Sequence, residues 1–386
     1  MPNRAHQTLR ILVYKTYNKA ANELVADLTA AWDDLDFSTA LHGGFKDCTI
    51  SVPMSMNKAV LALNRNLPGW HFYHLEISEN TRLVWEGRIM NVELIKSPGF
   101  QGIRLEAMGY WASMRDRLYA TAGTNFADSG TLIRTIVTQK CPDINGTADI
   151  GTTGLDITGI LLGTNDYPQN IIIDKIAPLS DTGTGIWYFS VYDNRKPTYA
   201  ARGTANLHWM IWMQDLDILN LKQQGEHLRN SIFPFVGTAT GTTTLDADST
   251  ARYVTREIIF QAPDGVAAGT ANKGRDAFLN DHKLPRQDLS FSISGHAYST
   301  QAGTATGTAG ALIEAQKWHM RAGQVIRIQD LYPASQASPV LDDIRTFYIL
   351  ETRYNANRDI ITIIPDRPMQ DLQTILAQQG TLERTS

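Results

Sequence analysis

The stretch L-H-G-G-F-K-D-C-T-I-S-V-P, residues 41–53, decides the fold class of this chain. It begins with a Gly-Gly pair, which is typical of a tight turn. Small and apolar side chains then recur up to a proline that ends the segment. Side chains of a strand point alternately to two faces, so this pattern predicts a half-buried β-strand. The residues that carry the pattern are Gly43, Gly44, Phe45, Cys48, Ile50, Val52 and Pro53.

Neighbouring segments repeat the strand pattern on both sides of this stretch. Residues 9–13 alternate, residues 71–76 and 82–95 form a hairpin pattern around residues 78–80, and residues 101–110 add another strand. Short, regularly spaced strands rich in aromatic and β-branched residues fit a compact β-barrel or a β-sandwich. We therefore expect an N-terminal β-barrel domain over residues 1–115. Residues 20–36 fit an amphipathic helix and a strand with a turn equally well.

The next segment has the periodicity of helices. Ser129 precedes an apolar face with a spacing of three and four residues, and Cys141-Pro142 follows it. A second helical pattern begins at Asp166, which can cap it. A hairpin pattern over residues 185–202 turns at residues 193–195. Together they predict a small α+β domain over residues 116–220.

Strand patterns return after residue 221. We expect residues 221–263 and 319–366 to form a second β-barrel domain. Between them, residues 264–318 read as an insertion with helices, one over 309–320, and Gly/Thr loops. Residues 367–386 predict a C-terminal helix capped by Asp366. The expected fold class is α+β, mainly β, with two barrel-like domains and a small α+β domain between them.

Composition excludes several classes of protein. The 386 residues carry a net charge of −4, which argues against a dedicated nucleic-acid binder, so no nucleic-acid specificity is expected. Two cysteines, Cys48 and Cys141, are too few for a disulfide framework or a cysteine-built zinc site. No apolar run reaches the ~18 residues of a membrane span. The charged fraction of 19% lies below the usual value of about 25%, which favours a surface covered by partners.

The sequence contains no recognisable catalytic pattern. It lacks the H-E-x-x-H zinc motif, the G-x-S-x-G nucleophile elbow and the phosphate-binding P-loop motif. We therefore expect no catalytic residue, no metal site and no cofactor, and a protein that is not an enzyme. Trp209, Trp212 and Asp215 could bind a glycan, although residues 209–213 read more simply as a buried or partner-covered strand.

Three motifs in series carry a resemblance. Residues 41–53, the V-W-E-G-R-I segment at 84–89 and the segment E-A-M-G-Y-W-A-S-M-R-D-R-L-Y at 106–119 resemble the N-terminal barrel of baseplate and tail-tip hub proteins of tailed bacteriophages. The order of barrel, small α+β domain and interrupted second barrel is also similar to that family. The insertion at 264–318 has no counterpart in the resemblance.

This resemblance implies a structural role in the virion. Hub proteins of that family form rings, commonly homotrimers, whose two barrels per subunit make a platform of pseudo-sixfold symmetry. The implied partners are further copies of the chain, a distal tail or tail tube protein, a tape measure protein, and a spike or fibre protein. The implied location is the virion tail tip, assembled in the host cytoplasm. A glycan-binding or glycan-depolymerising tail protein and the hexameric distal tail protein remain alternatives.

The motifs also supply candidate structural or interface residues. The aromatic members fit core packing of the first barrel as well as a subunit interface. The glycines fit tight turns or close strand approach, and the arginine fits an ion pair in its own chain or across a subunit boundary. The candidates are Gly43, Gly44, Phe45, Trp85, Gly87, Arg88, Tyr110 and Trp111.

Overall fold

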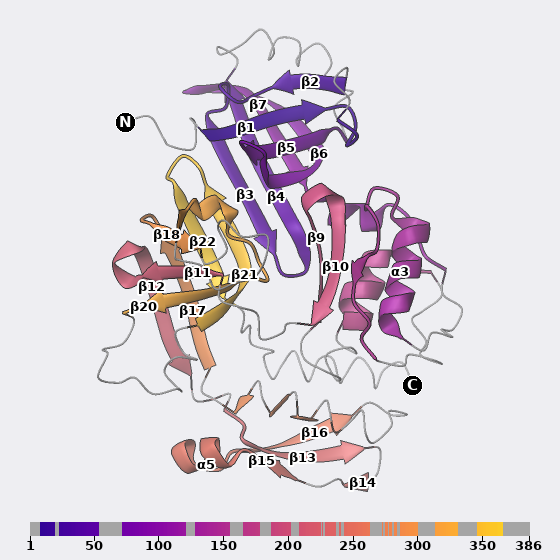
Figure 1. The fold of residues 1–386 in the computed structure, drawn as a ribbon, viewed down its shortest axis with the longest axis vertical. Helices are drawn as coiled ribbons and strands as arrows, with labels where there is room; N and C mark the ends of the chain where they lie inside the picture. The colour runs from indigo at the N-terminus through magenta and orange to yellow at the C-terminus, as the bar shows by residue number, and fades with distance from the viewer. Residues whose placement is uncertain are drawn as a thin grey trace.

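The chain folds into a mainly β structure of the expected α+β class, here seen in a computed structural model (Figure 1). The structure describes residues 8–19, 23–53, 72–120, 128–154, 165–177, 187–201, 208–224, 226, 228–236, 239–240, 243–262, 272, 275–276, 278–279, 282–283, 286–299, 313–330 and 346–365. The C-terminal helix predicted over 367–386 lies outside these residues.

The N-terminal strands form one antiparallel sheet that curves around an apolar core, and we call it the first barrel. Its spatial order is β2-β1-β5-β6-β7-β4-β3. The open question at residues 20–36 is settled for its described part, since these residues form a strand, a turn and the start of another strand. The strands are β1 (Leu9–Tyr14), β2 (Leu24–Asp27), β3 (Asp34–Ala40), β4 (Gly43–Pro53), β5 (His74–Glu79), β6 (Arg82–Ser97) and β7 (Phe100–Met108).

The middle segment forms a small α+β unit with its own apolar core. The predicted helix after Ser129 is confirmed, and Asp128 caps it by accepting from the backbone N–H of Thr131 at 2.9 Å. The predicted second helix is present but π-helical and begins later, so Asp166 is not its cap. The elements are η3 (Tyr110–Arg115), α3 (Ser129–Lys140), β8 (Asp149–Ile150), η4 (Asn170–Ile176), β9 (Trp187–Tyr192), η5 (Asp193–Arg195) and β10 (Lys196–Ala201).

A second sheet, which we call the second barrel, uses strands from several parts of the sequence. Its spatial order is β12-β17-β22-β21-β20-β11-β18-β19. The elements are β11 (Trp209–Trp212), η6 (Met213–Asp215), β12 (Leu216–Gln224), β17 (Arg286–Ile293), β18 (Ala297–Ser299), β19 (Ile313–Ala315), η7 (Lys317–His319), β20 (Val325–Gln329), β21 (Thr346–Asn355) and β22 (Ile360–Pro365).

The helix expected over residues 309–320 is wrong in its described part. Residues 313–315 form β19, and Lys317, Trp318 and His319 form a short 3-10 turn in which all three side chains are buried. Three consecutive buried residues do not fit a helix with one apolar face. Trp318 and His319 contact Glu79 of the first barrel, whereas Lys317 donates to the carbonyl of Ser294 and pairs with Asp359 of the second barrel.

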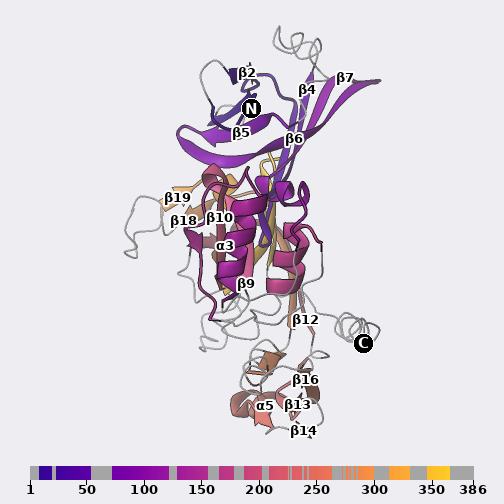
Figure 2. The ribbon, with the colours of Figure 1, turned by 90° about the vertical axis from the view of Figure 1, so that its right-hand side faces the viewer.

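A separate four-stranded sheet, which we call the distal sheet, comprises residues from the expected second barrel. Its strands pair with one another and not with the second barrel in the part of the chain that the structure describes. Strands β12 and β17 lead to it, and both views place it at the end of the long axis opposite β2 (Figures 1 and 2). It contains β13 (Ser231–Val236), β14 (Ala239–Thr240), β15 (Thr244–Leu245), α5 (Ala247–Tyr253) and β16 (Glu257–Ala262).

Two strand pairings join the units. β21 pairs antiparallel with β3 from Glu351↔Ala40 to Asn355↔Asp36, which connects the two barrels through a shared ladder. β4 pairs with β9 through Gly43↔Ser190 and Gly44↔Val191, which connects the first barrel to the α+β unit. One apolar cluster runs through both barrels. No helix among the described residues is long and apolar enough to cross a membrane.

Candidate functional site

The eight candidate residues from the sequence motifs gather where the first barrel meets the α+β unit. Gly44 shows why the two units can approach so closely. Its φ is +82°, and a Cβ atom built there would lie 2.2 Å from the carbonyl oxygen of Val191. Gly43 has φ +112° and lies against the ring of Trp111. Only glycine permits both this backbone conformation and this distance, so the pair fixes the junction.

Phe45 and Trp85 lie in the core of the first barrel beside this junction. They are 1% and 0% exposed, and their ring centroids are 6.2 Å apart. A Cβ atom at Gly87 would lie 2.5 Å from the Trp85 ring and 2.3 Å from the carbonyl oxygen of Met108. The core-packing interpretation of these aromatic residues therefore holds within the chain, and Gly87 provides the space for Trp85.

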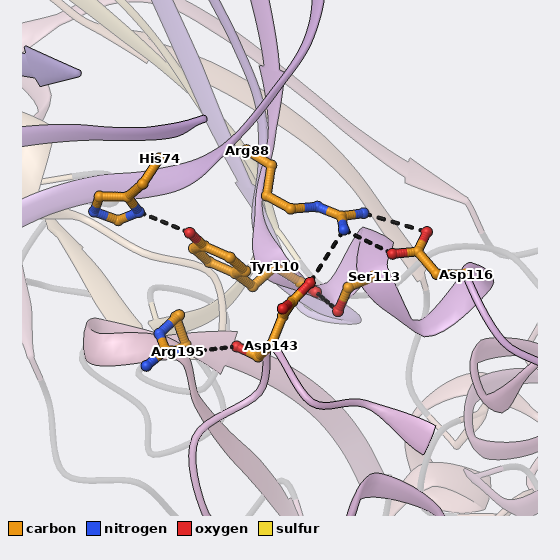
Figure 3. Close-up of polar contacts among 7 residues, drawn as sticks. All are labelled: His74, Arg88, Tyr110, Ser113, Asp116, Asp143 and Arg195. Carbon is orange, nitrogen blue, oxygen red and sulfur yellow. Dashed lines mark hydrogen bonds and ion pairs between the residues drawn. The ribbon is translucent and has the colours of Figure 1, made fainter. Parts of the chain in front are cut away.

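Arg88 is three residues beyond Trp85 on β6, so it faces the other side of the strand, and it is 5% exposed. Figure 3 shows its side chain pointing toward Asp116 and Asp143. Its guanidinium donates to Asp116 at 2.6 Å and to Asp143 at 3.2 Å. It also lies 5.2 Å from the ring centroid of Phe72. Both carboxylates belong to the same chain, so the ion pairs of Arg88 join the first barrel to the segment that leads into the α+β unit.

Tyr110 occupies the centre of this polar cluster. Its hydroxyl is 2.7 Å from Nδ1 of His74, and the two rings stack with centroids 5.8 Å apart. Ser113 donates to the backbone carbonyl of Tyr110 at 2.7 Å. Burial, together with the nearby Glu86 carboxylate, raises the pKa of Tyr110 far above its usual value. Tyr110 therefore stays a neutral phenol and serves packing and hydrogen bonding.

Sequence reasoning missed Arg195 and Glu86, which complete the cluster. The backbone N–H of Arg195 donates to Glu86 at 2.7 Å, and its guanidinium donates to the carbonyl of Asp143 at 2.9 Å. The same guanidinium lies 3.5 Å from the ring centroid of Tyr17. Burial raises the pKa of Glu86 to about 7, although the backbone hydrogen bond from Arg195 lowers this pKa. For Glu86 the sequence did contain a signal, because two charged residues, Glu86 and Arg88, lie within the apolar segment V-W-E-G-R-I. Both are buried in the structure.

A second contact region lies between the second barrel and the first. Arg321 donates to Asp193 at 2.8 Å and to the carbonyl of Leu83 at 2.8 Å. Nε2 of His319 lies 2.5 Å from Glu79 of β5. Burial, followed by the charges of Arg82 and Arg321, lowers the pKa of His319 to about 3. The segment after β19 thus holds all three units together.

The titratable side chains that could hold a metal or act as a nucleophilic thiol are placed as follows. Among the described residues, no group of three or more His, Cys, Asp or Glu side chains is placed to hold a metal ion. Cys48 and Cys141 are both buried, and burial raises the pKa of each thiol. A raised pKa disfavours the reactive thiolate. The arrangement is suited to holding domains together.

Comparisons with known proteins agree with this architecture. No family model matches the chain, and no curated protein matches it. Three solved structures align over almost the full length of both chains. A tail protein from Neisseria meningitidis MC58 is 9% identical, with a TM-score of 0.60, and the alignment covers 93% of this chain and 96% of that chain. The 43 kDa tail protein of prophage MuSo2 from Shewanella oneidensis is 11% identical, with a TM-score of 0.55 and coverages of 93% and 98%. Prophage tail protein gp18 from Listeria monocytogenes EGD-e is 11% identical, with a TM-score of 0.53 and coverages of 97% and 99%. The chain therefore has the fold of phage tail proteins.

Proposed function

We propose that this chain is a structural protein of a phage tail and that its copies form a ring-shaped hub at the tail tip. The ring would join the tail tube or distal tail protein to a central spike or fibre. The fold shared with three tail proteins supports the tail assignment. The proposal includes no enzymatic role, and it places the chain in the virion after assembly in the host cytoplasm.

The observation that carries this proposal is the strand pairing between the two barrels. Five residue pairs join β3 to β21, and the hydroxyls of Thr39 and Thr352 lie 2.7 Å apart across the pairing. Both threonines are buried. A shared ladder and a shared core fix the orientation of one barrel against the other. Three copies of such a two-barrel plate would present six barrels, which suits contact with a hexameric tube.

The experiment is to count copies and to locate them. Light scattering on the purified full chain, combined with size exclusion, should give a trimer. Electron microscopy of particles labelled with an antibody against the chain should mark the tail tip. A chain absent from the particle would overturn the tail assignment. Six copies around the tail axis would instead support the distal tail protein.

The glycan alternative receives less support from the described residues. Trp209 is 2% exposed, and its indole N–H donates to Gln324 at 2.7 Å, so this ring belongs to the core. Trp212 is half-buried and packs edge-on against Tyr298 at 4.7 Å between centroids. Incubation with host polysaccharides tests the alternative. Binding or turnover that Trp212→Ala abolishes would favour it over a purely structural role.

A further inference from the structure

The distal sheet has one covered face and one open face. On the covered face, Ile232 is fully buried, and Phe260 lies 6.0 Å from Phe278 between ring centroids. The register places Ile232 beside Ile258 on this face. The helical segment that contains Phe278 therefore covers this side. A sheet covered on one face needs a polar or occupied surface on the other.

The opposite face carries three large apolar side chains that are exposed. Phe233 lies beside Ile259 in the register, and Leu245 lies one row away, opposite Ser231. Their exposed fractions are 40%, 62% and 49%. We call Phe233, Leu245 and Ile259 the open face. Large apolar side chains gathered on an exposed surface mark interaction sites in soluble proteins.

Both barrels and the α+β unit, as far as the structure describes them, lie on the far side of a two-stranded connection. β12 and β17 pair from Leu216↔Ile293 to Gln224↔Arg286, while β22 pairs with β17 only at residues 291–293. The two strands thus continue past the second barrel as an arm, and the distal sheet lies at its end (Figures 1 and 2). The arm holds the open face away from the described body of its own chain, where a neighbouring copy can reach it.

A second surface of different composition lies on the outer face of the second barrel. Arg327, Met210, Tyr298 and Glu314 form one row across four neighbouring strands. Trp212 lies in the next row and packs against Tyr298. We call Met210, Trp212, Tyr298 and Arg327 the Trp212 patch, and all four are half-buried. Trp, Tyr, Met and Arg are the residue types enriched in the cores of protein interfaces.

The two surfaces have complementary charges at their edges. Glu257 is exposed and lies in the same row of the distal sheet as Leu245, with Ser231 between them. In the Trp212 patch the charge is Arg327, next to Met210. The other charged end of that row, Glu314, already has Nδ1 of His296 at 2.9 Å. An apolar face with one carboxylate therefore matches an apolar patch with one guanidinium.

We propose that the open face of the distal sheet docks on the Trp212 patch of a neighbouring copy of this chain. This inference rests on the proposed ring. The two surfaces are different and lie on different units, so their contact is head-to-tail. Such contacts form a ring when the rotation between neighbouring copies closes. The contact would place Glu257 of one copy near Arg327 of the next.

Site-directed crosslinking tests the contact directly. Full-length Ile259→Cys and Tyr298→Cys chains are co-expressed, and the assembled ring is treated with a short bis-maleimide. Cys48 and Cys141 are each 1% exposed, so they remain unreactive in the folded chain. We expect a crosslinked dimer from the mixture and none from either variant alone. Leu94→Cys, at an exposed position of the first barrel, replaces Tyr298→Cys as the matched control.

The outcomes separate this inference from the proposed function. A ring that gives no Ile259–Tyr298 crosslink, or crosslinks Ile259→Cys chains to one another, overturns the docking contact and leaves the ring intact. A wild-type chain that stays monomeric at high concentration overturns the ring and the contact together.

Charge reversal gives a second measurement. Glu257→Arg and Arg327→Glu should each weaken ring assembly about tenfold, and the double variant should recover most of it. Glu93→Arg, at an exposed position of the first barrel, is the matched control and should leave assembly unchanged. Single variants that assemble like the wild type, or a double variant no better than the singles, would contradict the contact.

Discussion

The junction around Gly44 and the distal sheet use apolar and charged residues in opposite ways. At the junction, Trp85 and Arg88 are buried, and each contacts groups of the same chain. On the distal sheet, Phe233 and Ile259 point to solvent, and the described chain does not cover them. The conspicuous motifs of the sequence thus mark internal joints. The exposed residues Phe233, Leu245 and Ile259 of the distal sheet belong to none of these motifs.

The largest effect is expected at Gly44, where the junction has no spare space. In Gly44→Ala, the new Cβ would lie 2.2 Å from the oxygen of Val191, in a backbone conformation with positive φ. We expect a loss of more than about 4 kcal/mol in the free energy of unfolding, or no folded protein. Thermal unfolding and the soluble yield measure it. Gly99→Ala is the control, since its φ is also positive but no atom lies within 4 Å, and it should lose only about 1–2 kcal/mol.

The next effect concerns the ion pairs of Arg88. Arg88→Met should cost about 2–3 kcal/mol, because Asp116 and Asp143 lose their shared cation. The side chains of both acids are partly exposed, at 46% and 27%, so water limits the loss. Urea unfolding measures it. Lys46→Met, which breaks the exposed pair with Glu351, should cost less than about 1 kcal/mol. If both variants lost the same free energy of unfolding, the buried ion pairs of Arg88 would be no more important for stability than an exposed surface pair.

Glu86 predicts a pH dependence at the same junction. Its folded-state pKa is about 7 against an ordinary 4.5, so the folded chain holds a proton there that the unfolded chain releases. The stability from this group is complete below about pH 4.5 and is lost as the pH rises through about 7. Neighbouring Lys19, Glu76, Asp193 and Arg195 set its surroundings.

Glu86→Gln isolates this dependence, because other titrating groups are common to both proteins. Between pH 8 and pH 5, the stability of the wild type relative to Glu86→Gln should rise by about 1–3 kcal/mol. Urea unfolding at both pH values gives the difference. A difference that stays constant, or falls towards pH 5, would contradict the buried, proton-holding carboxyl.

The smallest effect on folding is expected at the open face. Ile259→Thr should change the free energy of unfolding by no more than about 0.5 kcal/mol, since this side chain is 62% exposed. Ile232→Thr on the covered face should lose about 2–3 kcal/mol, because it places a hydroxyl at a fully buried position. Thermal unfolding of the two variants compares the faces. A large loss at Ile259 would mean that the chain itself depends on this face.

Local patterns predicted most of the strands, turns and helices. The hairpin at 193–195 and the helix from Ser129 follow from alternation, turn residues and a helical face. Partner choice was not predictable in this way. β11 lies within residues 116–220, yet it pairs with β20 and β18 of the second barrel. Alternation identifies a strand, but the identity of its neighbour depends on contacts far away in the sequence.

The candidate residues were found, but their surroundings were not. Gly43, Gly44 and Gly87 stood out because glycine in a strand signals close approach. What approaches them, Val191, Trp111 and Met108, comes from other segments of the chain. Arg195 gave no signal, because a basic residue in a turn is ordinarily solvated. Its contact with Glu86 arises only when the turn at 193–195 reaches β6.

The pairing of β3 with β21 also determines at which stage of synthesis the two barrels can join. Its hydroxyl contact, Thr39 to Thr352, spans 313 residues of chain. A ribosome that has made the first barrel still has most of the polypeptide to synthesise before β21 emerges. Until then the free edge of β3 is exposed, and contacts so distant in sequence form slowly. We therefore expect the two barrels to dock only after β21 has been synthesised.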